Sequence, residues 1–332
     1  MNTECPLCKN NEIDLLYTIS SEKAARHFKN LTDIPTDKFK KIIENLWKSK
    51  ASNINKCNKC NLVFSSPFVA GDNNFYSLFY DNFDNYPFWK WDFEETFDKL
   101  KKLNLKDNSQ IRILEIGSGN GVFLNKLAKE VASNEQIFCT ESSEYCIKEL
   151  RRKGFNNVYT DLSKIMENSE GIKFDAIFMF QVLEHLDQLD YLLNQIIDCL
   201  SFCGDIFITV PNNYQRELYE RMKIYEDIPP MHLSRWSLKS FQTLANNNNL
   251  NIIDYKIEPQ KYFSKLFRLA FFLSKQCNNR FIYFKIKNKI FVKLIRTLYI
   301  VYKFIINIKT IFLLHRKIYG TSSLVHLRKL NE

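Results

Sequence analysis

Three glycines within the segment Glu115-Ile-Gly-Ser-Gly-Asn-Gly121 separate a short apolar run from an amphipathic segment. Short β-rich runs alternate with segments that have apolar residues at helical spacing, and this pattern continues through residue 257. This alternation predicts a parallel sheet with helices on both of its faces. Gly154 and Gly204 follow two of the predicted helices and are expected to end them, because glycine readily adopts the left-handed conformation that closes a helix. The predicted strands are 111–116, 136–141, 158–160, 174–180, 205–210, 252–257 and 321–327, and the predicted helices are 122–129, 144–152 and 188–200.

The glycine loop lies at the first turn from strand to helix, where open α/β sheets bind ligands beyond the carboxyl ends of their strands. Glycine is needed there because side chains would keep a ligand away from the backbone. A dinucleotide-binding fingerprint has its third glycine one residue later, where this chain has Val122, so the loop favours a cofactor without a pyrophosphate group. Glu141, which ends the second predicted strand, is placed to accept hydrogen bonds from a ribose diol. The alternative for Glu141 is a solvated acid at a strand end.

The loop, Glu141 and the segment Phe174-Asp-Ala-Ile-Phe-Met-Phe-Gln-Val-Leu-Glu-His-Leu186 resemble successive motifs of class I S-adenosylmethionine-dependent methyltransferases, over about residues 111–257. The resemblance implies a Rossmann-like, mostly parallel seven-stranded sheet and S-adenosylmethionine as the cofactor. It implies that the glycine loop faces the amino-acid end and the ribose of the cofactor, that Glu141 binds the ribose hydroxyls, and that Asp161 lies near the adenine. A helix N-cap is an equally good interpretation of Asp161. The cofactor-binding residues implied in this way are Glu115, Gly117, Ser118, Gly119, Gly121, Glu141, Ser142, Asp161, Phe180 and Gln181.

Two cysteine pairs precede this region, Cys5-Pro-Leu-Cys8 and Cys57-Asn-Lys-Cys60. The two-residue spacing lets one turn offer both thiolates to a tetrahedral zinc ion, and four thiolates leave no open position, so the predicted zinc is structural. The amino terminus does not read as a secretory signal, which predicts a cytoplasmic protein whose paired cysteines bind metal rather than form disulfides. The long gap between the pairs predicts an inserted helical segment around 36–50. Four unrelated free cysteines are the alternative.

The predicted organisation has five parts. They are a zinc-ribbon-like unit at 1–70, an aromatic connector or lid at 71–107, the methyltransferase core at 108–258, a basic amphipathic helical insertion at 259–318, and the last core strand with the tail at 319–332. The cysteine pairs, the connector and the segment Pro229-Pro-Met-His-Leu233 also resemble methyltransferases of polysaccharide and deoxysugar gene clusters. This second resemblance implies a glycan or small-molecule acceptor.

Methyl transfer requires a nucleophile that is held in line with the methyl group and deprotonated. Three groups of residues are candidates for the base. His185 follows the fourth predicted strand, His232 lies on the loop before Trp236, and Tyr80 and Tyr86 lie on the connector. For the Glu184-His185 pair the alternative is a structural role, in which it holds its loop by hydrogen bonds.

Residues 261–332 contain 16 Lys and Arg residues and one acid, whereas the rest of the chain is mildly acidic. Across 261–317 the basic residues form a stripe on a wide apolar helical surface, which suits an anionic membrane interface. A transmembrane span is disfavoured, because no window of about 20 residues there lacks Lys and Arg. The alternative is an amphipathic helix that packs on the domain or on a dimer partner.

These features predict an S-adenosylmethionine-dependent methyltransferase that acts on a nucleotide- or lipid-linked sugar, as a peripheral protein at the inner membrane face. One alternative is an RNA methyltransferase acting on a base carbon or a ribose, with the basic tail binding phosphates. The segment after the fourth strand, Phe-Gln-Val-Leu-Glu-His, lacks the Asn/Asp-Pro-Pro-aromatic motif of enzymes that methylate exocyclic amines, so nucleic acid is the less favoured partner. A non-catalytic binding protein is the other alternative. The methylated atom and the oligomeric state are left open.

Overall fold

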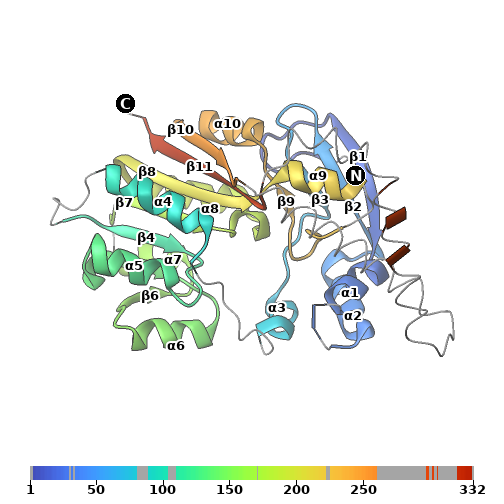
Figure 1. Ribbon diagram of the computed structural model, residues 1–332, viewed down its shortest axis with the longest axis horizontal. Coiled ribbons are helices and arrows are strands. Elements are labelled where there is room, and N and C mark those ends of the chain that lie inside the picture. The colour runs from blue at the N-terminus through green and yellow to red at the C-terminus, as the bar shows by residue number, and fades with distance from the viewer. Residues whose placement is uncertain are drawn as a thin grey trace. The chain divides into compact units, whose positions relative to one another are not determined.

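The computed structural model describes residues 3–29, 31–32, 34–80, 89–103, 110–169, 171–221, 225–259 and 320–330, together with 297–298, 301–302 and 305. The chain divides into two compact units. The first comprises Met1–Asn213, Glu226–Ile257 and Ser322–Glu332, and the second comprises Tyr214–Tyr225 and Glu258–Thr321. Both sheets described below belong to the first unit (Figure 1).

The larger sheet has seven strands in the order β10-β11-β8-β7-β4-β5-β6. Its strands are β4 (Ile113–Ile116), β5 (Ile137–Thr140), β6 (Asn157–Tyr159), β7 (Phe174–Phe180), β8 (Leu200–Pro211), β10 (Leu250–Ile257) and β11 (Ser322–Lys329). Strands β6, β5, β4, β7 and β8 pair in parallel, whereas β11 pairs antiparallel with both β8 and β10. The predicted mostly parallel, seven-stranded Rossmann-like sheet is therefore confirmed.

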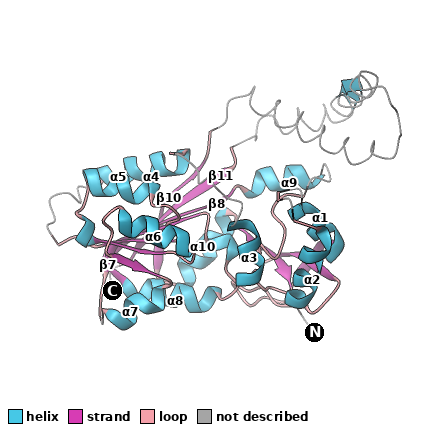
Figure 2. Ribbon diagram, turned by 90° about the horizontal axis from the view of Figure 1, so that it is seen from below, coloured by secondary structure: helices cyan, strands magenta, loops and turns pink. Residues whose placement is uncertain are grey.

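Helices cover both faces of this sheet. They are α4 (Trp91–Lys102), α5 (Val122–Glu130), α6 (Glu144–Arg152), α7 (Leu162–Asn168), α8 (Leu189–Cys199) and α10 (Leu238–Asn247). Successive residues of β7 point to opposite faces, as the period of a strand requires. Ile177 and Met179 lie in one core with residues of α7, α8 and α10, and Phe178 and Phe180 lie in the other with residues of α4, α5 and α6. Figure 2 shows α4 and α5 on one side of the sheet and α7 and α8 on the other.

The two glycines predicted to end helices behave differently. Gly154 has a φ of +89° and donates its N–H to the Arg151 carbonyl, so it closes α6 as predicted. The prediction for Gly204 was wrong, because this residue lies inside β8. Helix α8 ends at Cys199, and the next residue, Leu200, is already extended and pairs with Phe174 of β7. The strand pairing therefore ends this helix without a glycine cap.

The smaller sheet has the order β1-β2-β3-β9, and all of its pairs are antiparallel. Its strands are β1 (Ile13–Ser20), β2 (Ala51–Cys57), β3 (Val63–Ser66) and β9 (Ser234–Arg235), and α3 (Asn73–Tyr80) follows β3. Helices α1 (Ser21–Lys29) and α2 (Thr36–Trp47) connect β1 to β2. The helical segment expected between the cysteine pairs is thus present as α2, whereas α1 was not predicted.

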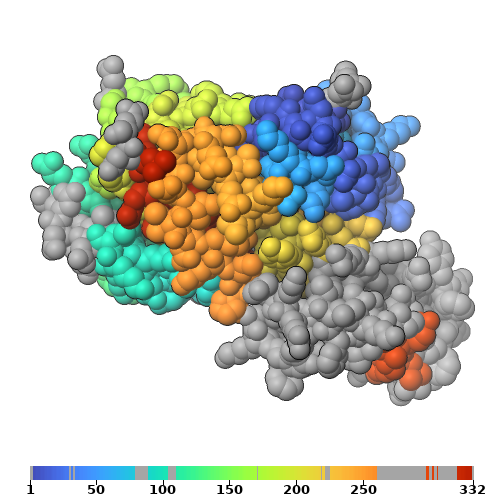
Figure 3. Space-filling view, turned by 90° about the horizontal axis from the view of Figure 1, so that it is seen from above, coloured from blue at the N-terminus to red at the C-terminus, as the bar shows by residue number. Residues whose placement is uncertain are grey.

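Strand β9 joins the amino-terminal segment to the core. It lies between β8 and α10 in the sequence, yet it pairs with β3, with Phe64 opposite Ser234 and Val63 opposite Arg235. One hydrophobic core accordingly contains Leu62 and Phe64 of the amino-terminal segment together with Trp236 and Phe241. The surface view shows the amino-terminal residues next to α10 and β10 (Figure 3).

Nearly all of the basic segment at 261–317 lies outside the described residues. Within the part of the chain that the structure describes, no helix has both the length and the hydropathy to cross a membrane.

Candidate functional site

The glycine loop connects β4 to α5. The loop has three glycines with positive φ values, +71° at Gly117, +55° at Gly119 and +76° at Gly121. Residues with a side chain rarely adopt this left-handed backbone conformation. A Cβ atom on Gly117 would lie 2.6 Å from Cγ2 of Val182, and one on Gly121 would lie 2.5 Å from Cδ2 of Leu150. Glycine is therefore required at both positions for two reasons: the backbone conformation is left-handed, and a neighbouring side chain approaches too closely for a Cβ atom. The contact with Val182 also brings the loop next to the segment that follows β7.

Glu141 is buried against this loop. One carboxylate oxygen accepts a hydrogen bond of 2.7 Å from the Gly119 N–H, and the other accepts one of 2.8 Å from the Ser143 N–H. Hydrogen bonds to a charged acceptor are among the stronger ones. Each carboxylate oxygen has a second acceptor site, so Glu141 can hold the loop and still bind hydroxyl groups. The structure thus brings the predicted acid and the glycine loop, with Ser118 and Ser142 beside them in the sequence, to one place.

Glu115, the last acidic residue before the loop, is also buried. Its side-chain Oε2 has no hydrogen-bond partner among the described residues. Burial raises the pKa of this carboxyl well above its usual range, Lys90 opposes that rise, and Glu141 and Asp92 add to it. A buried oxygen without a partner is costly unless something donates to it, which marks Glu115 as a point where a ligand can bind.

A polar network that the sequence analysis missed lies beside Glu115. Asp92, in the first turn of α4, is buried and pairs with Lys90 Nζ at 3.1 Å. Thr209 donates to Asp92 over 3.1 Å, and the Gln181 amide donates to Thr209 over 3.2 Å. Gln181 has a φ of +59°, an unusual conformation for a residue other than glycine. The sequence offers only one signal for Asp92 and Lys90, which is that they are polar residues within the segment predicted as an aromatic connector or lid.

Two further predicted cofactor residues have clear neighbours. Phe180 packs edge-on against Phe93 and against Phe123, with ring centroids 4.7 Å apart in both pairs. Asp161 caps α7 by accepting a hydrogen bond of 3.1 Å from the Lys164 N–H. Burial tends to raise the pKa of Asp161, but hydrogen bonds from Ser163 and Thr160 outweigh burial and lower it. The capping alternative is present in the structure, and the contact of Asp161 with adenine stays a prediction.

The two candidate histidines lie side by side. His185 belongs to the short 3-10 helix η3 (Leu183–His185), and its ring centroid lies 4.5 Å from that of His232. His185 Nδ1 is 2.7 Å from the Met231 carbonyl oxygen, and His232 Nδ1 is 3.1 Å from a carboxylate oxygen of Asp227. Burial and the neighbouring His232 lower the pKa of His185. The hydrogen bond to Met231 gives His185 the loop-holding role that was the structural alternative, and the role of His185 as a base stays a prediction.

Glu184 directly precedes His185 in η3, and its side chain is fully buried. Burial raises the pKa of its carboxyl to about 7, while the neighbouring His232 opposes that rise. Its backbone carbonyl accepts a hydrogen bond of 2.8 Å from the Leu233 N–H, which fixes the loop containing His232 to η3.

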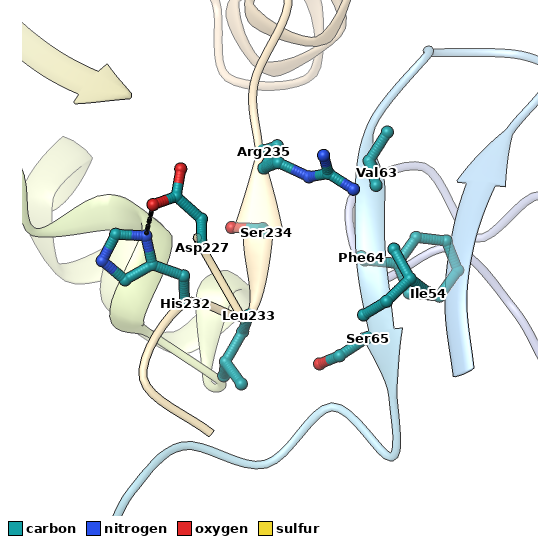
Figure 4. A pocket seen from close by; sticks show the side chains of 9 residues that line it. All are labelled: Ile54, Val63, Phe64, Ser65, Asp227, His232, Leu233, Ser234 and Arg235. Atoms are coloured by element: carbon teal, nitrogen blue, oxygen red, sulfur yellow. Dashed lines mark ion pairs between the residues drawn. The ribbon is translucent and has the colours of Figure 1, made fainter. Parts of the chain in front are cut away.

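A pocket that includes His232 is lined by residues of β2, β3 and β9 and of the loop before β9. Figure 4 shows the Arg235 side chain extending from β9 toward Val63, and the ion pair between Asp227 and His232. Arg235 is only 5% exposed. Neither Asp227 nor Arg235 was predicted, because only the pairing of β9 with β3 brings them to this place. The residues that line the pocket are Ile54, Val63, Phe64, Ser65, Asp227, His232, Leu233, Ser234 and Arg235.

The four predicted zinc ligands come together. The Sγ atoms of Cys5 and Cys60 are 3.5 Å apart, as are those of Cys8 and Cys57, and all four lie within 4.8 Å of one another. The two turns match, because Lys9 and Asn61 have φ values of +56° and +58° and donate their N–H groups to the carbonyls of Cys5 and Cys57 over 2.9 Å. Tetrahedral zinc with Zn–S bonds of about 2.3 Å requires sulfur atoms close to these distances. The arrangement is compatible with a zinc ion.

The two tyrosine candidates cannot be placed in this site. Tyr86 lies outside the described residues, and so does the side chain of Tyr80, whose backbone ends α3.

A family model described as a methyltransferase domain matches residues 88–255. No curated protein matches the chain. Among solved structures, a SAM-dependent methyltransferase from Archaeoglobus fulgidus is 19% identical with a TM-score of 0.45, over 77% of this chain and 100% of that chain. The N-methyltransferase NodS from Bradyrhizobium japonicum WM9, in complex with S-adenosyl-L-homocysteine, is 13% identical with a TM-score of 0.39, over 72% of this chain and 87% of that chain.

Likeness to solved structures at this level says nothing about the acceptor. The family match, in contrast, spans just over half of the chain and contains the glycine loop, Glu141 and the histidine pair. The chain therefore belongs to the methyltransferase-domain family and is an S-adenosylmethionine-dependent methyltransferase.

Proposed function

We propose that this enzyme transfers the methyl group of S-adenosylmethionine to a small-molecule or glycan acceptor, a nucleotide- or lipid-linked sugar, bound beside His185 and His232. The observation that carries the proposal is the contact between the glycine loop and the segment that contains the Glu184-His185 pair. Val182, which precedes the Glu184-His185 pair, lies directly against Gly117 of the glycine loop. A cofactor on the loop and an acceptor at the histidines would therefore be neighbours.

The residues at the loop fit S-adenosylmethionine. The partnerless oxygen of Glu115 suits the ammonium group of the amino-acid end, and Glu141 has acceptor sites left for the ribose hydroxyls. The positive φ values at Gly117, Gly119 and Gly121 keep side chains away from the path of the ligand. Phe180, Gln181, Ser118 and Ser142 complete the lining that we propose, and Asp161 is placed near the adenine.

The cofactor supplies a methyl group that is already activated as a sulfonium, so the chain has to bind, orient and deprotonate the acceptor. The Met231 carbonyl can only accept a hydrogen bond, so His185 donates through Nδ1 and keeps a lone pair on Nε2. A carboxylate oxygen of Asp227 lies 3.1 Å from His232 Nδ1, so this carboxylate would stabilise the protonated form of His232. Either imidazole is then suited to take the acceptor proton, and Tyr80 and Tyr86 are the further candidates.

The pocket beyond His232 supports an acceptor with an anionic group. The buried Arg235 lines this pocket, and a guanidinium is suited to bind phosphate in a bidentate manner. Nucleotide-linked and lipid-linked sugars both carry phosphate next to the sugar. The membrane part of the proposal depends on the sequence of 261–317, whose basic residues each add about 1 kcal/mol of attraction to anionic lipid.

We also propose that Cys5, Cys8, Cys57 and Cys60 bind one structural zinc ion. Their position supports this role, since Cys60 accepts a hydrogen bond from Ser240 of α10 through its backbone carbonyl and packs in the main core. A metal there would hold the turn before β1 to the turn between β2 and β3.

The cofactor site is tested by replacing Glu141. We expect Glu141→Gln to weaken binding of S-adenosylmethionine by about 10–100-fold, because a hydrogen bond to a charged group contributes about 1.5–3 kcal/mol. Isothermal titration calorimetry measures this change. Glu144→Gln is the matched control, because the side chain of Glu144 is 90% exposed at the start of α6. Equal affinities of the two variants would contradict the assignment of Glu141.

The acceptor class is tested by incubating the full chain with labelled S-adenosylmethionine and separate pools of nucleotide sugars, lipid-linked sugars and RNA. We expect label in a sugar pool. The lipid-linked arm is run in anionic and in neutral vesicles, and faster transfer in anionic vesicles is expected from the basic tail. Labelling of RNA alone would replace this proposal with the nucleic-acid alternative, and failure to bind the cofactor would favour a binding protein.

The role of the histidines is tested with the acceptor so identified. His185→Asn and His232→Asn should each lower kcat by about 10²–10⁴-fold and leave the Kd of S-adenosylmethionine unchanged. His27→Asn, on α1, is the control for loss of a histidine elsewhere. If both variants methylate at the rate of the unmodified enzyme, neither histidine acts on the acceptor.

The zinc proposal is tested by elemental analysis and thermal unfolding. Cys60→Ser should lose the bound zinc and lower the Tm, because binding of a structural metal contributes directly to folding. Cys203→Ser should change neither quantity, since Cys203 is exposed and lies outside the cysteine cluster. Unmodified protein that contains no zinc when purified without chelators would overturn the proposal.

A further inference from the structure

Lys90, the N-cap residue of α4, places a positive charge among the acids of the candidate site. Its Nζ lies 3.1 Å from a carboxylate oxygen of Asp92 and 4.6 Å from the centre of the Phe93 ring. Within the part of the chain that the structure describes, the ammonium has no other ion pair or ring contact. An ammonium has three donors, and the Lys90 side chain is 29% exposed, so a ligand can reach the donors that Asp92 does not use.

The contacts of Asp92 hold Lys90 at the carboxyl ends of β7 and β8. Asp92 is buried and accepts a hydrogen bond of 3.1 Å from Thr209 of β8. Thr209 in turn accepts one of 3.2 Å from the side chain of Gln181, the residue directly after β7, and its carbonyl accepts one of 2.9 Å from the Gln181 N–H. Ligands of open α/β sheets bind at this edge. Lys90 is therefore fixed where a ligand is expected.

The charge of Lys90 acts on both ends of the site. Burial raises the pKa of Glu115 well above its usual range, and it raises the pKa of Glu184 to about 7. The positive charge of Lys90 opposes the rise at both carboxyls, as does His232 at Glu184. Glu115 belongs to β4, just before the glycine loop, whereas Glu184 directly precedes His185 in η3. The ammonium is thus near the proposed cofactor site and near the proposed acceptor site.

We infer that the Lys90 ammonium binds the acceptor hydroxyl that receives the methyl group and stabilises the negative charge that develops on its oxygen. The inference rests on the proposed function, in which the acceptor lies beside the histidines. A fixed charge that faces a developing charge of opposite sign is among the largest contributions to catalysis, because it is already in place when the reaction occurs. Asp92 is then the positioning residue that holds this ammonium.

The reaction that follows is balanced without a further reactant. The hydroxyl proton passes to Nε2 of His185, which retains a lone pair because Nδ1 donates to the Met231 carbonyl. The oxygen, paired with the Lys90 ammonium, forms a bond to the methyl carbon. The bond between carbon and sulfur breaks, and its electron pair stays on the sulfur. The products are a methyl ether, S-adenosylhomocysteine and one proton on His185.

A test that needs no acceptor compares the two forms of the cofactor. S-adenosylmethionine and S-adenosylhomocysteine differ by the sulfonium charge, which an ammonium beside the reacting atoms repels. Lys90→Gln keeps a donor for Asp92 but removes the charge. It should raise the ratio of the Kd of S-adenosylhomocysteine to the Kd of S-adenosylmethionine by about 3–10-fold, as measured by calorimetry on the full chain. Lys102→Gln is the matched control, because Lys102 is exposed at the other end of α4, and it should not change this ratio.

The rate is then measured with whichever acceptor pool becomes labelled. Lys90→Gln should lower kcat by about 10²–10³-fold, since one stabilising group for the developing charge is lost. Lys90→Arg retains the charge and should recover most of the rate, and Lys102→Gln should methylate like the unmodified chain. Each variant is verified as folded by circular dichroism, and Lys90→Met replaces Lys90→Gln if the latter does not fold.

Two results would overturn the inference. One is an affinity ratio in the neutral variant equal to that of the unmodified chain, because a lower kcat alone would mean that Lys90 only holds Asp92 in place. The other is an unchanged kcat in the neutral variant. If the unmodified chain binds S-adenosylmethionine and labels an acceptor, either result contradicts the role of Lys90 alone. An unmodified chain that does not bind S-adenosylmethionine contradicts the proposed function itself.

Discussion

Two hydrogen bonds at the backbone of Leu233 determine how this enzyme is assembled. The N–H donates to the Glu184 carbonyl in η3, which follows β7, and the carbonyl accepts from the Ser65 N–H in β3. One residue therefore ties the cofactor end of the large sheet to the small sheet that contains the cysteines. His232 and Ser234 flank it, so the position of the second histidine and the pairing of β9 both depend on this connection. Because buried backbone groups must be paired, the connection is costly to break.

The amino-terminal segment is consequently part of the site rather than an appendage. Its strand β3 forms one wall of the pocket that contains Arg235 and His232, and the core beneath that wall includes Cys60 and Phe64 next to Trp236. A change at the cysteine cluster would reach the proposed acceptor pocket through this shared core, since densely packed interiors transmit strain. The same arrangement explains how a short strand of two residues, Ser234–Arg235, is stable at all: β3 and the loop on either side hold it.

How far the sequence predicts this fold depends on the range of the interactions involved. Strand β7 and helix α6 have the predicted bounds, because their signals are local. Strand β7 is a nearly continuous apolar run, and α6 is capped by Ser143 and closed by Gly154. Gly204 was misjudged because long-range pairing of Leu200 with Phe174, and not a helix cap, ends the preceding helix. Strand β9 gave no local signal, since two residues show no periodicity.

The same distinction between local signals and long-range interactions applies to the residues of the candidate site. The glycine loop and Glu141 could be found from the sequence because a turn and a strand end fix their geometry, as the contact of Glu141 with Gly119 shows. Asp227 and Arg235 could not, since each acquires a partner or a pocket only through tertiary pairing. Glu184 precedes His185 directly in the sequence. Its side chain is completely buried and its carboxylate has no hydrogen-bond partner among the described residues, and no local sequence pattern predicts either property.

Charge is the last constraint on this active site. Glu115, Glu141 and Asp92 gather at the carboxyl ends of β4 and β5 and the start of α4, and Lys90 is the cation that the structure places with them. Burial, together with the neighbouring charges of Glu141 and Asp92, raises the pKa of Glu115 well above its usual range, so an ionised Glu115 is unfavourable here. If S-adenosylmethionine binds here as we propose, its sulfonium and ammonium groups would reduce the excess negative charge. Transfer of the methyl group removes the sulfonium charge, so these carboxyl groups would then attract S-adenosylmethionine more strongly than S-adenosylhomocysteine and favour release of the product.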